Sequence, residues 1–202
     1  MTTLEILRPS EVFPTWRRAQ LVVDQHAYEL PPSPHVLRTT GQLEPEHAAR
    51  VTDWFLTAPA PPVEAVAHAY RALERDTRRL FALVRNLGVR VVHVDADPGV
   101  SAAELCSDVR DHGLLTLTRD EPHPLFGAFD ELRALHDVFG HAALGLGFDL
   151  QSEFATWLQC RTLFSSAARP AAFCELVGAV TAYVSTGVKP GLRAKLPPAG
   201  WA

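Results

Sequence analysis

The sequence predicts a mainly α-helical protein with a small two-stranded sheet, in a single domain over residues 1–202. Two observations lead to this prediction. After about residue 45, apolar side chains recur at helical spacing along most of the chain. Two short runs, VRVVHVD (89–95) and GLLTLT (113–118), instead have the composition of strands that could pair with each other. A content of 47 % hydrophobic and 21 % charged residues is ordinary for a globular protein.

The first elements follow from proline placement and apolar spacing. Residues 1–45 are expected to be irregular, because PPSP (31–34) favours extended or turn conformations. A helix is expected after Glu44, and APAPP (58–62) ends it. A longer helix should run from about Val63 to Leu87, where Gly88 ends it. Its apolar face comprises Val66, Tyr70, Leu73, Leu80 and Val84.

The second half of the chain alternates between the two strands and further helices. Ser101 and Glu104 form a capping-box pattern that opens a helix reaching about Asp111. Three helices are expected after the second strand, over about 128–139, 150–165 and 170–186. Chemistry-bearing residues concentrate in this last region, so a metal site is predicted among the helices of residues 128–187.

Composition excludes several classes of protein. A net charge of −4 argues against nucleic-acid binding. No apolar run approaches a membrane span, and MTTLEILRPSEVF has no signal-peptide pattern, so no membrane partner and a cytoplasmic location are expected. Three widely spaced cysteines are expected to be reduced core residues. The oligomeric state is left open.

Two histidines are the first candidate metal ligands. His136 follows Leu132 by four residues and precedes Phe139 by three, so it should point inward with them. His141 is five residues further on, which on a regular helix places it about 140° away from His136. A helix that ends at Gly140 with positive φ would allow His141 to turn back towards His136. The alternative is one core histidine and one exposed at the helix end.

Glu175 is the expected third ligand. It is the only charged residue of PAAFCELVGAVTAYVSTG (170–187). Small residues three and four positions away, including Gly178, predict a closely approaching neighbour. A buried carboxylate needs a partner, which a metal would supply, although Arg161 or Arg169 could serve instead. Two histidines and one carboxylate are typical of non-haem Fe(II) oxygenases.

Two further acids are candidate catalytic residues. Glu153 begins the 150–165 helix, where it either complements the helix dipole or lies at the site as a supporting group or additional ligand. Asp137 follows His136 directly and either orients an imidazole, acts as a base or is simply solvated.

The segment HDVFGH (136–141) resembles the His-Glu-x-x-Gly-His iron-binding segment of the aromatic amino acid hydroxylases, and FDLQSEFATW (148–157) is similar to the helix that follows it there. The likeness covers about residues 130–187. It implies Fe(II) held by His136, His141 and Glu175. Elsewhere the chain looks like uncharacterised actinobacterial and phage-borne proteins with a His-Asp-x-Phe-Gly-His segment, which imply no function.

The resemblance has limits. Asp137 replaces a glutamate that lies beside the pterin in that family, the chain is shorter than the hydroxylase domain, and no pterin loop is found, so a pterin cofactor stays open. The leading hypothesis is an Fe(II) enzyme that uses O₂ to oxidise a small aromatic or amino-acid-derived molecule. The alternatives are a zinc hydrolase with the same site, in which Asp137 or Glu153 is the base, and a non-enzymatic helical binding module with structural histidines.

Overall fold

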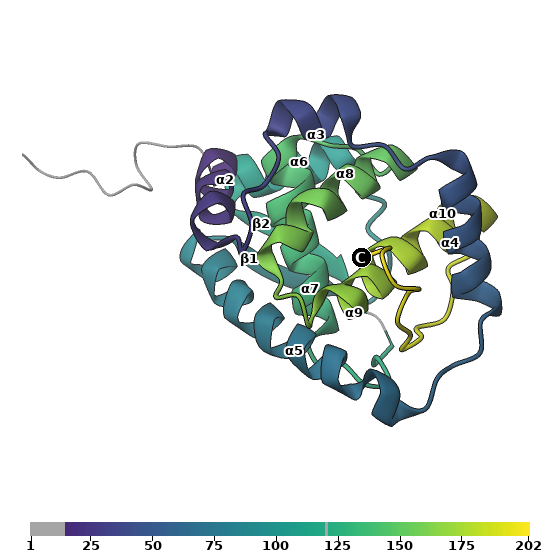
Figure 1. Ribbon diagram of the computed structural model, residues 1–202. Coiled ribbons are helices and arrows are strands. Elements are labelled where there is room, and N and C mark those ends of the chain that lie inside the picture. The colour runs from purple at the N-terminus through teal and green to yellow at the C-terminus, as the bar shows by residue number, and fades with distance from the viewer. Residues whose placement is uncertain (1–14, 120) are drawn as a thin grey trace, which may run out of the picture.

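The computed structural model describes residues 15–119 and 121–202 and is mainly helical with one small sheet, which confirms the predicted fold class (Figure 1). The helices before the sheet are α2 (Thr15–His26), α3 (Pro34–Thr40), α4 (Pro45–Thr57) and α5 (Val63–Asn86). The sheet region comprises β1 (Arg90–Val94), α6 (Ala102–Ser107), the π-helical turn η1 (Asp108–His112) and β2 (Leu114–Thr118). The remaining elements are α7 (Phe129–His136), η2 (Asp137–Ala142), α8 (Leu150–Cys160), η3 (Arg161–Leu163), α9 (Arg169–Phe173), η4 (Cys174–Gly178) and α10 (Ala179–Thr186).

The expectation of an irregular N-terminal segment is wrong for α2 and α3. Pro34 does not break a helix but occupies the first turn of α3, where its missing N–H costs nothing. The Ser33 side chain caps that helix by accepting a hydrogen bond from the Val36 N–H at 3.3 Å. α2 buries Ala19 and Val23 in the core. Residues 1–14 of the expected segment lie outside the described residues.

The two strands pair in parallel, with Arg90 opposite Leu114 and Val94 opposite Thr118. A parallel pair needs a crossover connection, which α6 and η1 supply. The capping box predicted at Ser101 and Glu104 is present and starts this crossover.

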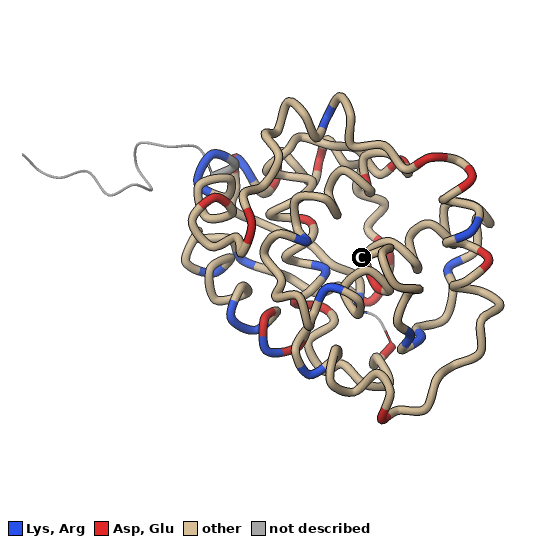
Figure 2. Tube along the Cα trace, viewed as in Figure 1, with Lys and Arg blue, Asp and Glu red and all other residues tan. Residues whose placement is uncertain are grey.

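Helix α5 is the longest element and supports the core. Its apolar face, with Leu73, Leu80 and Val84 fully buried, packs against α7 and α9. Figure 1 shows α5 along the edge of the molecule, with the later helices stacked against it. Lysine, arginine, aspartate and glutamate are interleaved along its outer face (Figure 2). None of the described helices has the length and apolar character needed to cross a membrane.

Helix α4 packs on η4 and α10 on the other side of the molecule. A side chain at Gly178 would lie 2.8 Å from Phe55 Cδ2 and 2.9 Å from Trp54 Cζ3, so this glycine allows close approach, and the close neighbour predicted from the small residues is confirmed. The segment of residues 188–202 forms hydrogen bonds with the end of α4. Lys195, which is 2 % exposed, donates from Nζ to the Phe55 carbonyl at 2.9 Å and also to the Ala58 carbonyl.

Candidate metal centre

A π-helical turn brings the two histidines together. His136 is the last residue of α7, and His141 lies in η2, which continues the helix. In a π-helix the hydrogen bonds join residues five apart, so such residues lie about one turn from each other. The expectation that the helix ends at Gly140 with positive φ is wrong. The helical conformation continues to Leu144, and Gly145, at φ 67°, is the residue that takes the left-handed conformation.

Gly140 instead lets α8 pack closely on η2. A Cβ at this position would lie only 1.9 Å from Thr156 Cγ2, far inside van der Waals contact. Gln159, also on α8 and fully buried, donates from Nε2 to the Phe139 carbonyl within the wide turn. The Asp149 side chain caps the start of α8 by accepting from two backbone N–H groups. These contacts fix α8 so that its first turn faces the histidines.

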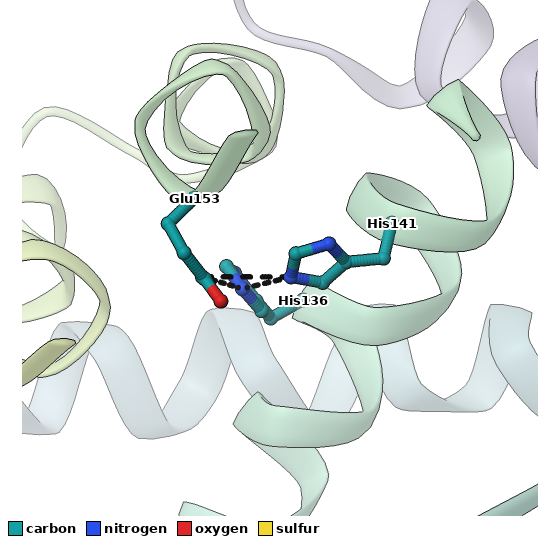
Figure 3. Close-up of side chains that lie close together, drawn as sticks. All are labelled: His136, His141 and Glu153. Carbon is teal, nitrogen blue, oxygen red and sulfur yellow. Dashed lines mark hydrogen bonds and ion pairs between the residues drawn. The ribbon is translucent and has the colours of Figure 1, made fainter. Parts of the chain in front are cut away.

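Glu153, in that first turn, completes a cluster of three donor groups (Figure 3). Glu153 Oε2 lies 2.9 Å from His136 Nε2 and 3.4 Å from His141 Nε2. The two Nε2 atoms are 3.0 Å apart. Figure 3 shows the carboxylate approaching from α8 and both rings approaching from the α7–η2 helix. In the described part of the chain this is the group of side chains suited to hold a metal ion.

The tautomer of His141 suits a ligand. Its Nδ1 lies 3.4 Å from the Leu146 carbonyl oxygen, which can only accept a hydrogen bond. The proton of a neutral His141 ring therefore belongs on Nδ1, and Nε2 presents its lone pair to the cluster. Metal-binding histidines usually donate their second N–H in this way. His136 Nδ1 is buried and has no hydrogen-bond partner among the described residues.

The Glu153 carboxylate and the histidines beside it shift pKa values within the cluster. Burial opposes ionisation of Glu153, but hydrogen bonds with His136 and His141 outweigh it and lower the pKa of the carboxyl to about 2. Burial likewise disfavours a charged His141, but the contact with Glu153 outweighs it and raises the pKa of that imidazole. Without a metal the carboxylate thus favours a protonated His141, whose charge a bound cation would replace.

The spacing of the three donors fits a single ion. With nitrogen and oxygen ligands at about 2.0–2.2 Å, neighbouring donors are about 2.8–3.1 Å apart in octahedral geometry and about 3.3–3.6 Å apart in tetrahedral geometry. The observed separations of 2.9, 3.0 and 3.4 Å lie within these ranges. Two imidazole nitrogens and one carboxylate oxygen suit Fe(II) or Zn²⁺.

Glu175 lies elsewhere in the site. The structure places Glu153, and not Glu175, against the two histidines. Glu175 accepts a hydrogen bond from the Tyr70 hydroxyl, and its Oε1 lies 3.3 Å from His123 Nε2. It does not belong to the cluster, whose donor atoms all lie within 4.8 Å of one another.

The arginines expected as alternative partners of Glu175 do not contact it. Arg169 pairs with Glu29, with 2.5 Å between Nη1 and Oε1. Arg161 Nε is buried without a hydrogen-bond partner in the described part of the chain. Sequence reasoning missed Tyr70 and His123, because Tyr70 belongs to the ordinary apolar face of α5 and His123 to a loop.

Asp137 is partly buried next to the cluster, but it is not part of it. Burial raises the pKa of its carboxyl, an effect that the nearby His136 and His141 oppose. The structure therefore leaves Asp137 free for a role beside the cluster.

The cluster opens onto a cleft of about 500 Å³. One helical face, formed by Glu175, Leu176, Ala179, Val180 and Tyr183, lines one wall. Two aromatic side chains, Phe129 and Phe148, also line the cleft. The Phe148 ring lies edge-on to the His141 ring, with centroids 5.0 Å apart. Lys189, Pro190 and Leu192 of the C-terminal segment line it as well. A cleft of this size that combines apolar side chains with polar and charged ones suits a small organic molecule that carries polar groups.

No protein-family model, curated protein or solved structure matches the chain. The likeness of HDVFGH to the hydroxylase segment therefore rests on the sequence pattern alone.

Proposed function

We propose that the protein is a mononuclear non-haem Fe(II) enzyme that uses O₂ to oxidise a small aromatic or amino-acid-derived molecule. The observation that carries the proposal is the convergence of His136, His141 and Glu153 within 3.4 Å of one another at a cleft of about 500 Å³. Glu153 replaces Glu175 in the ligand set expected from the sequence.

The choice of iron follows from the donor set. Two histidines and one carboxylate on one face leave open positions for O₂ and substrate, which is the arrangement of non-haem Fe(II) oxygenases. The bound ion would supply the activation of O₂. The residues of this protein would hold the ion, orient the substrate and exclude water. The Leu146 backbone carbonyl fixes the His141 tautomer, and the Phe148 ring packs edge-on against the His141 ring.

A zinc hydrolase is the second candidate, and Asp137 is the observation that favours it. This carboxylate lines the cleft beside the cluster without belonging to it, so it is placed to accept a proton from a water molecule at the site. The three ligands would leave the fourth zinc position open, as in catalytic zinc sites.

The test begins with metal content. Protein reconstituted anaerobically with Fe(II), or separately with Zn²⁺, should hold one ion per chain by elemental analysis. His136→Ala and His141→Ala should lose the ion, whereas His68→Ala, which alters an exposed histidine of α5, should retain it. A ratio near zero in the unmodified protein would contradict both enzyme proposals and favour a binding module with structural histidines.

Activity then separates the two metals. The iron proposal expects O₂ consumption by the Fe(II)-loaded protein with a panel of small aromatic compounds and amino acids, and none by the Zn²⁺-loaded protein. Hydrolysis of esters or amides by the Zn²⁺ form, lost in Asp137→Asn while zinc stays bound, would instead support the second candidate.

A further inference from the structure

Glu175 is a buried carboxylate that the proposed metal site does not use. Its side chain is only 1 % exposed, yet the residue lines the cleft. The Tyr70 hydroxyl and His123 Nε2 both approach the same oxygen, Oε1. Among the described residues no hydrogen bond or ion pair to Oε2 is found. The Tyr70 hydroxyl thus holds one oxygen of the carboxylate, and the adjacent Cys174 thiol is uncharged, since burial and Glu175 raise its pKa.

The groups that hold Glu175 are neutral. The Leu125 backbone N–H donates to His123 Nδ1 at 3.2 Å, so Nδ1 carries a lone pair and the ring proton lies on Nε2, which is 3.3 Å from Glu175 Oε1 but makes no hydrogen bond among the described residues. An imidazolium would place a second N–H against the backbone donor. Tyr70 is also uncharged, because burial and the neighbouring Glu175 raise its pKa well above the usual range. Neither partner therefore balances the charge of the carboxylate.

The two rings beside Glu175 are fixed in position. The His123 ring stacks between Tyr70, with centroids 5.2 Å apart, and Phe129, with centroids 5.8 Å apart. Phe129 itself lines the cleft. Arg133 and Lys189 also line the cleft, but no ion pair joins either of them to this carboxylate among the described residues. A buried carboxylate without a paired cation is costly, since its charge lacks the stabilisation of water.

The ion of the proposed metal site is not that cation. Two ligands of one ion can be no more than about 4.4 Å apart, which is twice the longest usual metal–oxygen distance for zinc. Glu175 lies outside the group whose atoms fall within 4.8 Å of one another, so it cannot share an ion with His136, His141 and Glu153 in this arrangement.

We infer that Glu175 is the substrate anchor of the cleft and that it binds a protonated amine. The substrate class is then a small primary ammonium compound whose apolar or aromatic body lies along Leu176, Val180 and Phe129. This inference rests on the proposed function in that it takes the cleft to be a substrate site, and it adds the charge and chemical class of the group that the cleft recognises.

The test compares three ligands of similar size that differ in charge: 2-phenylethylamine, 2-phenylethanol and 3-phenylpropionate. Their dissociation constants are measured by calorimetry at pH 7, with the metal-free and the Zn²⁺-loaded protein. Glu175→Gln removes the charge and keeps the shape. Glu131→Gln is the matched control, since this partly exposed residue of α7 pairs loosely with Arg78 and does not line the cleft.

The unmodified protein should bind the amine more tightly than the alcohol and the acid, in both metal states. Hydrogen bonds to charged groups correspond to about ten- to a hundredfold in affinity, so Glu175→Gln should remove a preference of that size while Glu131→Gln retains it. Circular dichroism checks the fold of each variant, and Zn²⁺ affinity of Glu175→Gln should match the unmodified protein.

Three results would overturn the inference. The first is equal or weaker binding of the amine by the unmodified protein, which needs no variant. The second is a preference for the amine that survives in folded Glu175→Gln. The third is loss of Zn²⁺ from folded Glu175→Gln, because the carboxylate would then be a metal ligand. Failure of metal binding in the unmodified protein, with amine selectivity intact, would refute the proposed function alone.

Discussion

Substituting Gly140 by alanine tests whether close packing of α8 on η2 builds the metal site. The new Cβ would lie 1.9 Å from Thr156 Cγ2 and 3.1 Å from Thr156 Cβ. Contact between carbon atoms is comfortable at about 3.5 Å, so the methyl group must move by about 1.6 Å or the helices must separate. Thr156 is fully buried and lies one turn after Glu153, so a shift of α8 moves the Glu153 carboxylate, the proposed ligand, as well.

Overpacking of this kind costs about 1–3 kcal/mol. For a chain of this size each kcal/mol shifts the melting temperature by about 2–4 °C, so the metal-free Gly140→Ala protein should melt about 2–12 °C lower. Metal sites tolerate donor shifts of only about 0.2 Å, so Zn²⁺ affinity should fall by about tenfold or more. Differential scanning calorimetry and competition with a chromogenic chelator measure the two effects.

The double variant Gly140→Ala/Thr156→Ser provides the control. Serine removes only the methyl group that the new Cβ meets, so the double variant should regain most of the lost stability and metal affinity relative to Gly140→Ala. Wild-type stability and metal affinity in the single variant would refute the packing argument. If Gly140→Ala loses stability and metal affinity and Thr156→Ser restores neither, the cause would lie in the conformation of the helix instead.

The remaining predictions concern charge and capping. Glu153→Gln should sharply lower metal affinity while Glu175→Gln leaves it nearly unchanged, and the opposite ranking in a chelator competition would return Glu175 to the ligand set. In the metal-free protein, the Glu153 pKa of about 2 compared with its usual 4.5 stabilises the fold above about pH 4.5 by on the order of 3 kcal/mol. This contribution to the free energy of unfolding should be lost as the pH falls towards 2. In urea titrations, the free energy of unfolding of Glu153→Gln should therefore fall less over this pH range than that of the unmodified protein. The raised pKa of His141 stabilises the fold below its ordinary value of 6.5, and this contribution is lost as the pH rises through the folded-state pKa, which the same titrations continued to alkaline pH would detect. Lys195→Met removes the ammonium group that donates to the Phe55 and Ala58 carbonyls, and of these two the Phe55 carbonyl keeps a donor in Arg193 Nη1 at 3.2 Å. The substitution should cost about 1–3 kcal/mol, and an unchanged melting temperature would show that this cap contributes nothing.

Most of the fold after residue 45 could be predicted, because its signals are local. Residues close together in the sequence specify the apolar face of α5, the capping box of α6 and the two short strands. The parallel direction of the strands could not be predicted, since it depends on the path by which α6 and η1 lead the chain back to the sheet. The helix α3 was missed because PPSP was interpreted as a break, although a proline in the first turn also starts a helix.

The candidate site was also predicted only in part. That His136 and His141 face each other could be anticipated from their inward positions, but the reason was wrong, because an intervening π-helical turn has no simple sequence signal. The choice between Glu153 and Glu175 depends on which helix packs on η2, and that contact is set by Gly140 and Thr156, which are distant in sequence. The partners of Glu175 come from α5 and a loop, so no pattern near Glu175 could reveal them.

The wide turn of η2 also determines how this helix responds to a change in its length. With five residues from His136 to His141, the rings meet only because one residue is accommodated as a bulge. Deleting a residue between them would give a spacing of four, which a regular α-helix already places on one face. Inserting one would give a spacing of six, which a regular helix places about 120° apart around its axis and about 9 Å apart along it, too far for the two rings to meet. Loss of a codon here is therefore less damaging to the histidine pair than gain of one.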